Sequence, residues 1–256
     1  MIEIPLLTII GGLLTISVRL TGLMLFAPWF GSTVIPARIK AGLVLALTLL
    51  LFPSVGKGIA TFPTAQWPVL IITEFIIGVG MGLATNVVFE GAQMAGEILG
   101  IQMGYSLVTI LDPMSQSETK VIPLFYQSMV VLLFLCMDVH YWLLKAIGSS
   151  FLSVPPGTMH LSGLFTWAVI ATGGTLFGLG VQIAAPVLSA TLVVDVLLGL
   201  MGKASPQMPL IVLGPAIKSI LGVLILIATL KFWPDLYHHL FVDSVTAGEH
   251  MLHLAR

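Results

Sequence analysis

Residues 163–200 read GLFTWAVIATGGTLFGLGVQIAAPVLSATLVVDVLLGL, an almost continuous apolar run whose one charged side chain is Asp195. At 1.5 Å per residue this run would form about 55 Å of helix, whereas a bilayer core is about 30 Å thick. We therefore expect a membrane helix that kinks, tilts steeply or folds back near Pro186. The run predicts an all-α fold, a polytopic hydrophobic helical protein with kinked helical hairpins.

The composition places the chain in a membrane or a membrane-like assembly. Of its 256 residues, 57% are hydrophobic and 8% are charged, whereas soluble domains carry about a quarter charged residues. Apolar runs of about 18 residues or more recur, and each is long enough to cross a bilayer core. The net charge of -1 lacks the basic excess that binds phosphate backbones, so we expect membrane lipid and no nucleic acid as surroundings.

Further apolar segments predict the other helices, and proline and glycine residues mark their ends. These segments span residues 4–30, 41–53, 68–89, 121–137 and 207–233, and the second is short for a full crossing. An amphipathic piece ends before Pro155-Pro156-Gly157. An amphipathic C-terminal tail covers about 235–256, and no linker interrupts the chain, so residues 1–256 are expected to form a single helical domain.

Small and polar residues predict two surfaces where helices meet. Gly78, Gly80 and Gly82 would let neighbouring helices approach closely. On a helix over 90–104, an arc of about 120° would hold Glu90, Gln93, Gly96, Glu97, Gly100 and Gly104. Because carboxylates at membrane depth usually face a bundle interior or an aqueous cavity, this arc predicts a seam between subunits or a conduit. The alternative is an interfacial helix whose carboxylates reach headgroup water.

Three charged residues lie inside apolar segments, namely Arg19, Glu74 and Asp195. Charges at membrane depth are costly, so one of them is expected to be the partner of another across the bundle. The sequence does not say which residues pair. The alternative for each is a long side chain that reaches the interface from a helix end.

Enzyme chemistry finds no support in the sequence. Gly104-Tyr105-Ser106-Leu107 lacks the second glycine of a serine-hydrolase elbow. His-Glu-x-x-His and the phosphate-binding Gly-x-x-x-x-Gly-Lys-Ser/Thr do not occur. We therefore predict no enzyme, no catalytic residue, no cofactor and no metal site, and any energy for transport would come from elsewhere.

A central run carries the resemblance to a known family. It reads Ala95-Gly96-Glu97-Ile98-Leu99-Gly100-Ile101-Gln102-Met103-Gly104-Tyr105-Ser106 and is followed by Asp112-Pro113. Supporting pieces are spread over the chain: Arg19 to Pro28, Ile35-Pro36-Ala37-Arg38-Ile39-Lys40, Leu132-Leu133-Phe134-Leu135 with His140, Ser150-Phe151, Pro155-Pro156-Gly157 and Ser205-Pro206-Gln207. The chain resembles the FliR family of flagellar type III secretion export-gate proteins over nearly its whole length.

The resemblance implies a channel subunit that passes unfolded flagellar proteins and is needed for flagellum assembly. It implies a fold like a fusion of the FliP and FliQ gate subunits. FliP-type and FliQ-type gate subunits and FlhB-type and FlhA-type export proteins would be its partners. The implied location is the bacterial inner membrane, within the flagellar basal body.

The resemblance also implies a plug-like loop in the channel at about 105–119. The residues expected there are Tyr105, Ser106, Leu107, Val108, Thr109, Ile110, Leu111, Asp112, Pro113, Met114 and Ser115. Asp112 to Lys120 is also the most polar stretch before the tail, and Pro113 disfavours helix at Asp112. Both observations favour a loop between two helical halves.

Two alternative functions stay open at this point. The injectisome version of the gate is closely similar, and Val139 stands before His140 where the family often has glycine. A small-solute secondary transporter would use broken helices and intramembrane charges such as Arg19, Glu74 and Asp195. A transporter would take up solute as the isolated chain, whereas a gate subunit would copurify with other small helical membrane proteins.

Overall fold

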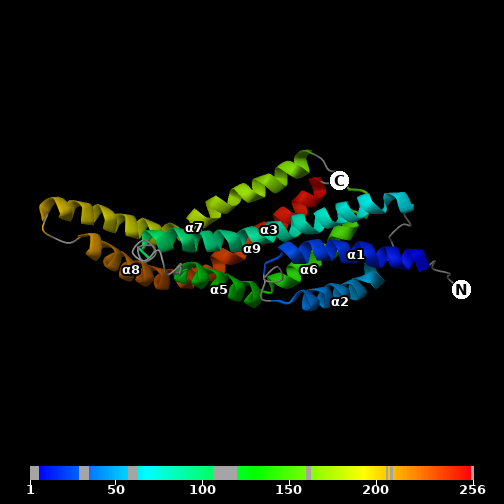
Figure 1. The fold of residues 1–256 in the computed structure, drawn as a ribbon, viewed down its shortest axis with the longest axis horizontal. Helices are drawn as coiled ribbons and strands as arrows, with labels where there is room; N and C mark the ends of the chain where they lie inside the picture. Colours follow the sequence, from blue (N-terminus) through cyan, green and yellow to red (C-terminus); the bar gives the residue numbers. More distant parts are fainter. Residues whose placement is uncertain are drawn as a thin grey trace, which may run out of the picture. The chain divides into compact units, whose positions relative to one another are not determined.

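A computed structural model describes residues 6–28, 35–56, 63–105, 120–159, 163–205, 207 and 210–254, and these ranges are helical without any strand (Figure 1). The elements are α1 (Leu6–Phe26), α2 (Ala37–Val55), η2 (Thr64–Gln66), α3 (Trp67–Gln102), α5 (Val121–Cys136), α6 (Val139–Ser153), α7 (Gly163–Ala204), α8 (Leu210–Thr229), η3 (Leu230–Phe232) and α9 (Trp233–Leu254). The prediction of an all-α fold is confirmed for this part of the chain.

Among the described residues, five helices are long and apolar enough to cross a membrane, or up to six if a bent pair counts as one span. The bent pair is α5 and α6, which meet at Met137 and Asp138. Asp138 has a φ of 55°, a left-handed conformation that aspartate tolerates better than most residues. The prediction of a polytopic membrane protein is confirmed.

Two helices are longer than the apolar segments suggested. α3 is 36 residues long, so the less hydrophobic residues after Phe89 continue the same helix. α2 has 19 residues and passes through Pro53, so the expectation that it is short for a crossing was wrong. Because Pro53 stands in the last turn, the hydrogen bond that its missing N–H removes, to the carbonyl of Leu49, lies near the end of the helix.

The long helix α7 does not reverse its direction at Pro186. It continues as one helix of 42 residues with Pro186 inside it. Folding back was therefore a wrong alternative, while a kink and a steep tilt stay predictions. Membrane helices tolerate an internal proline because neighbouring groups can satisfy the freed carbonyl.

The chain divides into two compact units, each described here by itself. The first unit comprises residues 1–88, 134–174 and 240–256, and the second comprises 89–133 and 175–239. The prediction of a single domain over 1–256 stays a prediction.

Close contact between α1 and α3 organises the first unit. A Cβ atom placed on Gly22 or Gly78 would overlap backbone of the opposite helix, and one on Gly82 would lie 2.8 Å from the carbonyl oxygen of Leu23. Gly80 faces Phe165 instead, at an ordinary 3.6 Å. The prediction of close helix contact is thus confirmed at Gly78 and Gly82, while Gly80 has room for a side chain.

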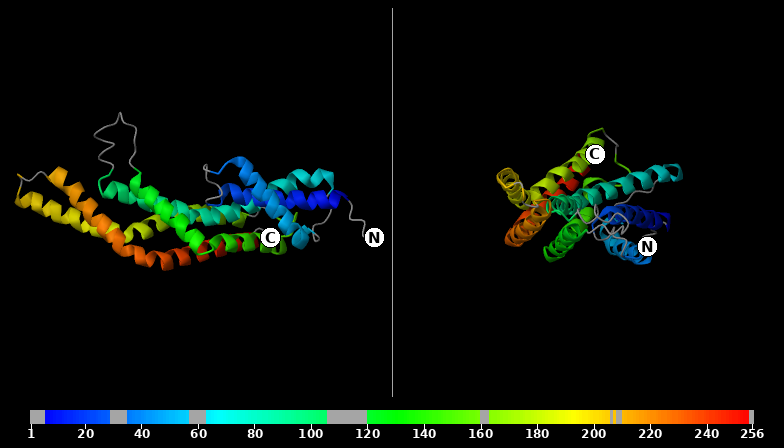
Figure 2. Two further views of the ribbon diagram at one scale, coloured as in Figure 1. Left: turned by 90° about the horizontal axis from the view of Figure 1, so that it is seen from below. Right: turned by 60° about the vertical axis from the view of Figure 1, so that its left-hand side comes forward.

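Apolar side chains complete the core of the first unit around this contact. The buried residues include Ile16, Leu20 and Leu23 of α1, Ile77 and Met81 of α3, Leu143, Ile147 and Phe151 of α6, and Leu252 of α9. α2 lies beside α1 and runs in the opposite direction (Figure 2). Most of α2 faces away from the rest of the unit, since only 6% of its span is buried.

The second unit packs small residues against bulky ones. Gly180 lies against Met94, and Gly222 lies against Met103. An aromatic group of Phe125, Tyr126, Trp233 and Tyr237 joins α5 to α9, with the rings of Tyr126 and Trp233 4.8 Å apart. Such interlocking sets how closely the helices of this unit approach.

Candidate functional site

The first unit encloses an ion pair between Arg19 of α1 and Glu74 of α3. Nε of Arg19 donates to Oε2 of Glu74 at 2.7 Å, and Nη2 lies 2.6 Å from the same oxygen. Both side chains have 0% of their surface exposed. The sequence left the pairing of its three intramembrane charges open, and the structure joins these two.

The segment that includes α6 and the turn after it supplies the remaining contacts of Arg19. Nη1 donates to Oγ of Ser150 at 2.9 Å, and Nη2 donates to the carbonyl oxygen of Val154 at 3.1 Å. The guanidinium carbon lies 3.9 Å from the centre of the Phe151 ring, which is a cation–π arrangement. The charge on Arg19 is therefore surrounded by acceptors and an aromatic face.

The Pro155-Pro156-Gly157 motif shapes the backbone beside this ion pair. The N–H of Thr158 donates to the carbonyl of Pro155 at 3.1 Å, and Gly157 has a φ of 78°. Proline at the second position and a positive φ at the third are typical of a type II turn. The Gly157 N–H also interacts with the Glu74 carboxylate, while Oε1 of Glu74 has no hydrogen bond of standard geometry to any described residue.

We name Arg19, Glu74, Ser150, Phe151 and the 154–157 backbone the Arg19 cluster. Three of its pieces were separate motifs in the sequence: Arg19, Ser150-Phe151 and Pro155-Pro156-Gly157. The sequence did not reveal that they meet, nor that Ser150 accepts a hydrogen bond from Arg19. Opposite charges within apolar segments were the one signal that could have pointed to this site.

The second unit holds a smaller polar network around Asp195 of α7. Nζ of Lys218 lies 2.8 Å from Oδ1 of Asp195, and Nε2 of Gln102 donates to Oδ2 at 2.8 Å. The Lys218 and Asp195 side chains are 17% and 39% exposed. Sequence reasoning missed Lys218, because one lysine in an apolar helix gives no sign of its partner.

The end of α3 is held beside the same network. Oγ of Ser219 donates to the Tyr105 hydroxyl at 3.0 Å, and the backbone at Gly104 packs against Pro215. Gly104 has a φ of 87°, which glycine adopts without strain. Of the expected plug residues, Tyr105 lies in the described part of the chain, whereas Ser106 to Ser115 lie outside the described residues.

The small and polar face predicted over 90–104 has two kinds of surroundings. Glu90 and Glu97 are exposed, and Nε2 of Gln93 donates to Oε1 of Glu97 at 3.3 Å. Gly96 is buried against Pro123, whereas no described residue lies within 4 Å of a Cβ atom placed on Gly100. Because α3 ends at Gln102, Gly104 is not part of the helical arc. The seam and the interfacial alternatives both stay predictions.

Within the described ranges, no group of three or more histidine, cysteine, aspartate or glutamate side chains could hold a metal ion. The polar sites found there join helices to one another through ion pairs and hydrogen bonds. They define a polytopic helical membrane protein whose buried charges connect its spans.

Comparison with known proteins gives the family. A sequence model described as bacterial export proteins, family 1, matches residues 10–244, and the chain belongs to this family. The flagellar biosynthetic protein FliR of Pectobacterium carotovorum is 30% identical, over 88% of this chain and 87% of the relative. FliR of Escherichia coli is 28% identical, over 88% and 86%. The resemblance to the FliR family is confirmed.

A relative from a different apparatus is also similar. The secretion system apparatus protein SsaT of Salmonella typhimurium is 25% identical, over 81% of each chain. The family therefore includes both flagellar relatives and a secretion-system relative.

Proposed function

We propose that this chain is an export-gate subunit of the flagellar type III secretion apparatus, through which unfolded flagellar proteins pass. The observation that carries the proposal is the family match over residues 10–244, together with flagellar relatives that align with most of the chain. The role is that of a conduit without enzymatic activity. Energy for transport is supplied by other components.

The surfaces of the spans support assembly with other subunits. Large apolar side chains are exposed on several helices, among them Leu50 at 71%, Phe177 at 65% and Ile220 at 66%. Such surfaces need lipid or other helices as surroundings. We infer that FliP-type and FliQ-type subunits cover part of them, that FlhB-type and FlhA-type proteins make further contacts, and that the assembly lies in the bacterial inner membrane.

The segment 105–119 is proposed to act as a plug in the passage. The bond between Tyr105 and Ser219 fixes the chain where this segment begins. Deletion of 106–117 should raise ion leakage through the assembled complex, measured as conductance in planar bilayers. Wild-type conductance in a complex that still contains all subunits would contradict the plug role.

Complementation tests the proposed function as a whole. In a flagellated host whose own FliR gene is deleted, expression of this chain with its cognate gate subunits should restore motility and secreted flagellin. A strain that expresses this chain without its cognate gate subunits serves as the control. Failure to restore secretion, although the chain reaches the membrane at wild-type level, would contradict the proposal.

The similarity to SsaT favours one second candidate, a gate subunit of an injectisome. A second host strain, which lacks its injectisome gate subunit, separates the two when it is compared with the strain that lacks FliR. Recovery of an injectisome secretion defect, with no recovery of motility, would favour the injectisome role. A small-solute transporter receives less support, because Arg19 and Glu74 pair with each other and Asp195 pairs with Lys218.

A further inference from the structure

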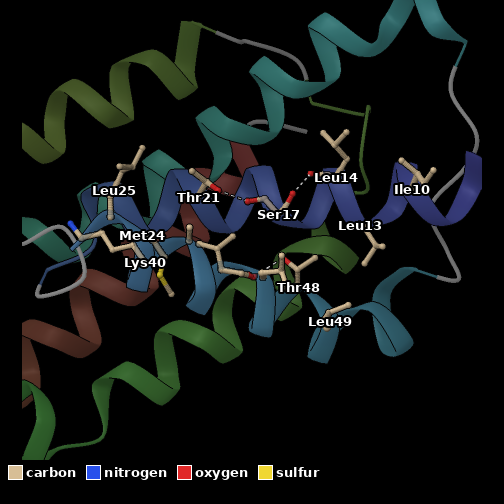
Figure 3. Close-up of a pocket in the computed structure, with 14 residues that line it drawn as sticks. Ile10, Leu13, Leu14, Ser17, Thr21, Met24, Leu25, Lys40, Thr48 and Leu49 are labelled. Atoms are coloured by element: carbon tan, nitrogen blue, oxygen red, sulfur yellow. Dashed lines mark hydrogen bonds between the residues drawn. The ribbon is translucent and has the colours of Figure 1, made fainter. Parts of the chain in front are cut away.

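An apolar groove of about 650 Å³ runs between α1 and α2 in the first unit (Figure 3). Its walls include Ile10, Leu14 and Leu25 of α1 and Val44, Leu45 and Leu49 of α2. Leu25, Leu45 and Leu49 are each more than half exposed. The groove therefore presents an open apolar surface along two membrane helices.

The few hydroxyl groups in the groove already donate hydrogen bonds to backbone carbonyls of their own helices. Thr21 donates to the carbonyl of Ser17 at 2.7 Å, and Thr48 donates to the carbonyl of Val44 at 2.7 Å. Ser17 donates to the carbonyl of Leu14 at 2.8 Å. Because each donor is satisfied within its own helix, the middle of the groove suits a ligand without polar groups.

Lys40 places a positive charge at one end of the otherwise apolar groove. Figure 3 shows its side chain beside Met24 and Leu25, while Ile10, Leu13 and Leu49 lie toward the other end. No described residue forms an ion pair with Lys40. Lys40 also stands near the start of α2, where the helix dipole is positive and Pro36 provides no side-chain cap. This end therefore favours an anion.

We propose that this groove binds an anionic phospholipid, with the phosphate at Lys40 and an acyl chain along the apolar walls. Lys40 and Leu49 are separated by about 14 Å of helix, which gives the chain a long apolar path. The charge at one end and the apolar length beyond it match the two parts of a lipid molecule. Basic residues at the start of a membrane helix are also the expected place for headgroups.

Photo-crosslinking identifies what occupies the groove. A photo-crosslinking amino acid replaces Leu45, which lines the groove, or Leu50, which is also exposed on α2 but does not line it. The full chain is irradiated in native membranes with its partner subunits and analysed by mass spectrometry. We expect an anionic phospholipid adduct at Leu45, enriched several-fold over position 50.

Charge substitution tests the role of Lys40. Arg38 offers a matched control because it lies two residues away, about 160° around the helix, and does not line the groove. The purified complex is placed in nanodiscs of equal parts phosphatidylglycerol and phosphatidylcholine, and retained lipid is measured by native mass spectrometry. Lys40→Gln should lower the preference for phosphatidylglycerol about fivefold, whereas Arg38→Gln should leave it near the wild-type value.

Filling the groove provides a variant that keeps all charges. Ala41→Leu adds bulk to the groove wall, whereas Gly42→Leu adds similar bulk outside the lining, at a position where no described residue lies within 4 Å of the new Cβ. Ala41→Leu should reduce the retained phospholipid, and Gly42→Leu should not. Both positions are exposed, so neither change disturbs the core.

Three results would overturn the proposal. The first is a crosslink from position 45 to a neighbouring subunit or a second copy of this chain. The second is equal lipid labelling at positions 45 and 50, and the third is equal lipid preference in the Lys40 and Arg38 variants. None of these results contradicts the export role, so the lipid site and the export role can fail separately.

Discussion

The Arg19 cluster of the first unit and the Asp195 network of the second unit hold opposite charges at similar distances but in different surroundings. Arg19 and Glu74 lie 2.6 Å apart with no exposed surface, whereas Lys218 and Asp195 lie 2.8 Å apart and remain partly exposed. Coulombic attraction grows as water is excluded, and so does the penalty for a charge that loses its partner. Burial, more than distance, therefore decides how much stability the protein loses when one charge of a pair is removed.

Removing one charge from the Arg19 cluster should cause the greatest loss of stability. Glu74→Leu leaves the guanidinium buried without a counter-charge, and we expect a loss of about 3–5 kcal/mol in the free energy of unfolding. Reversible unfolding in mixed detergent micelles measures this loss, and the amount of protein in the membrane reports it in cells.

The double variant Arg19→Met with Glu74→Leu is the control for this experiment. It removes both charges and keeps apolar volume, so it should recover more than half of the lost stability. If the double variant is as unstable as the single one, loss of side-chain packing rather than a stranded charge explains the effect.

Substitution of the glycines on α3 should have an intermediate effect. Gly78→Ala places a methyl group against the α1 backbone beside Arg19, and we expect a loss of about 1–3 kcal/mol. Gly80→Ala is the matched control, because its new methyl group meets Phe165 at 3.6 Å. The same unfolding assay compares them, and equal stability of the two variants would mean that α1 and α3 are not in close contact.

Substitutions in the Asp195 network should have the least effect on stability. Asp195→Asn keeps an acceptor for Gln102 and removes the attraction to Lys218, and we expect a loss of about 1 kcal/mol or less. Added salt should shrink the difference further. A loss as great as that of Glu74→Leu would show that this pair is shielded from water in the assembled protein.

Local sequence signals predicted much of the fold. Pro28 and the Pro155-Pro156-Gly157 motif lie just beyond α1 and α6, where the helices end. Gly78 and Gly82 indicated a close helix contact because small residues are the means by which membrane helices approach. These features act within a few residues of chain, so they can be recognised without knowing the rest of the structure.

Other features depended on residues far apart in the chain. Arg19 and Ser150 are separated by 131 positions, and Gln102 and Asp195 by 93, so no local pattern could pair them. The length of α3 was also not predicted from the sequence, since the apolar segment ended at Phe89 and the helix ends at Gln102. Glu90 and Glu97 lowered the hydrophobicity after Phe89, yet they lie exposed while Ala92, Ala95 and Leu99 keep that part of the helix packed.

The position of Arg19 in the chain also affects how the protein enters the bilayer during synthesis. The ribosome makes Arg19 55 residues before Glu74, and the 155–157 turn follows later still. An arginine at the centre of a helix opposes insertion by about 2.5–3.5 kcal/mol. The first helix therefore reaches the insertion machinery before its neutralising residue exists, so the apolar residues of α1 itself must offset this cost until α3 has been translated.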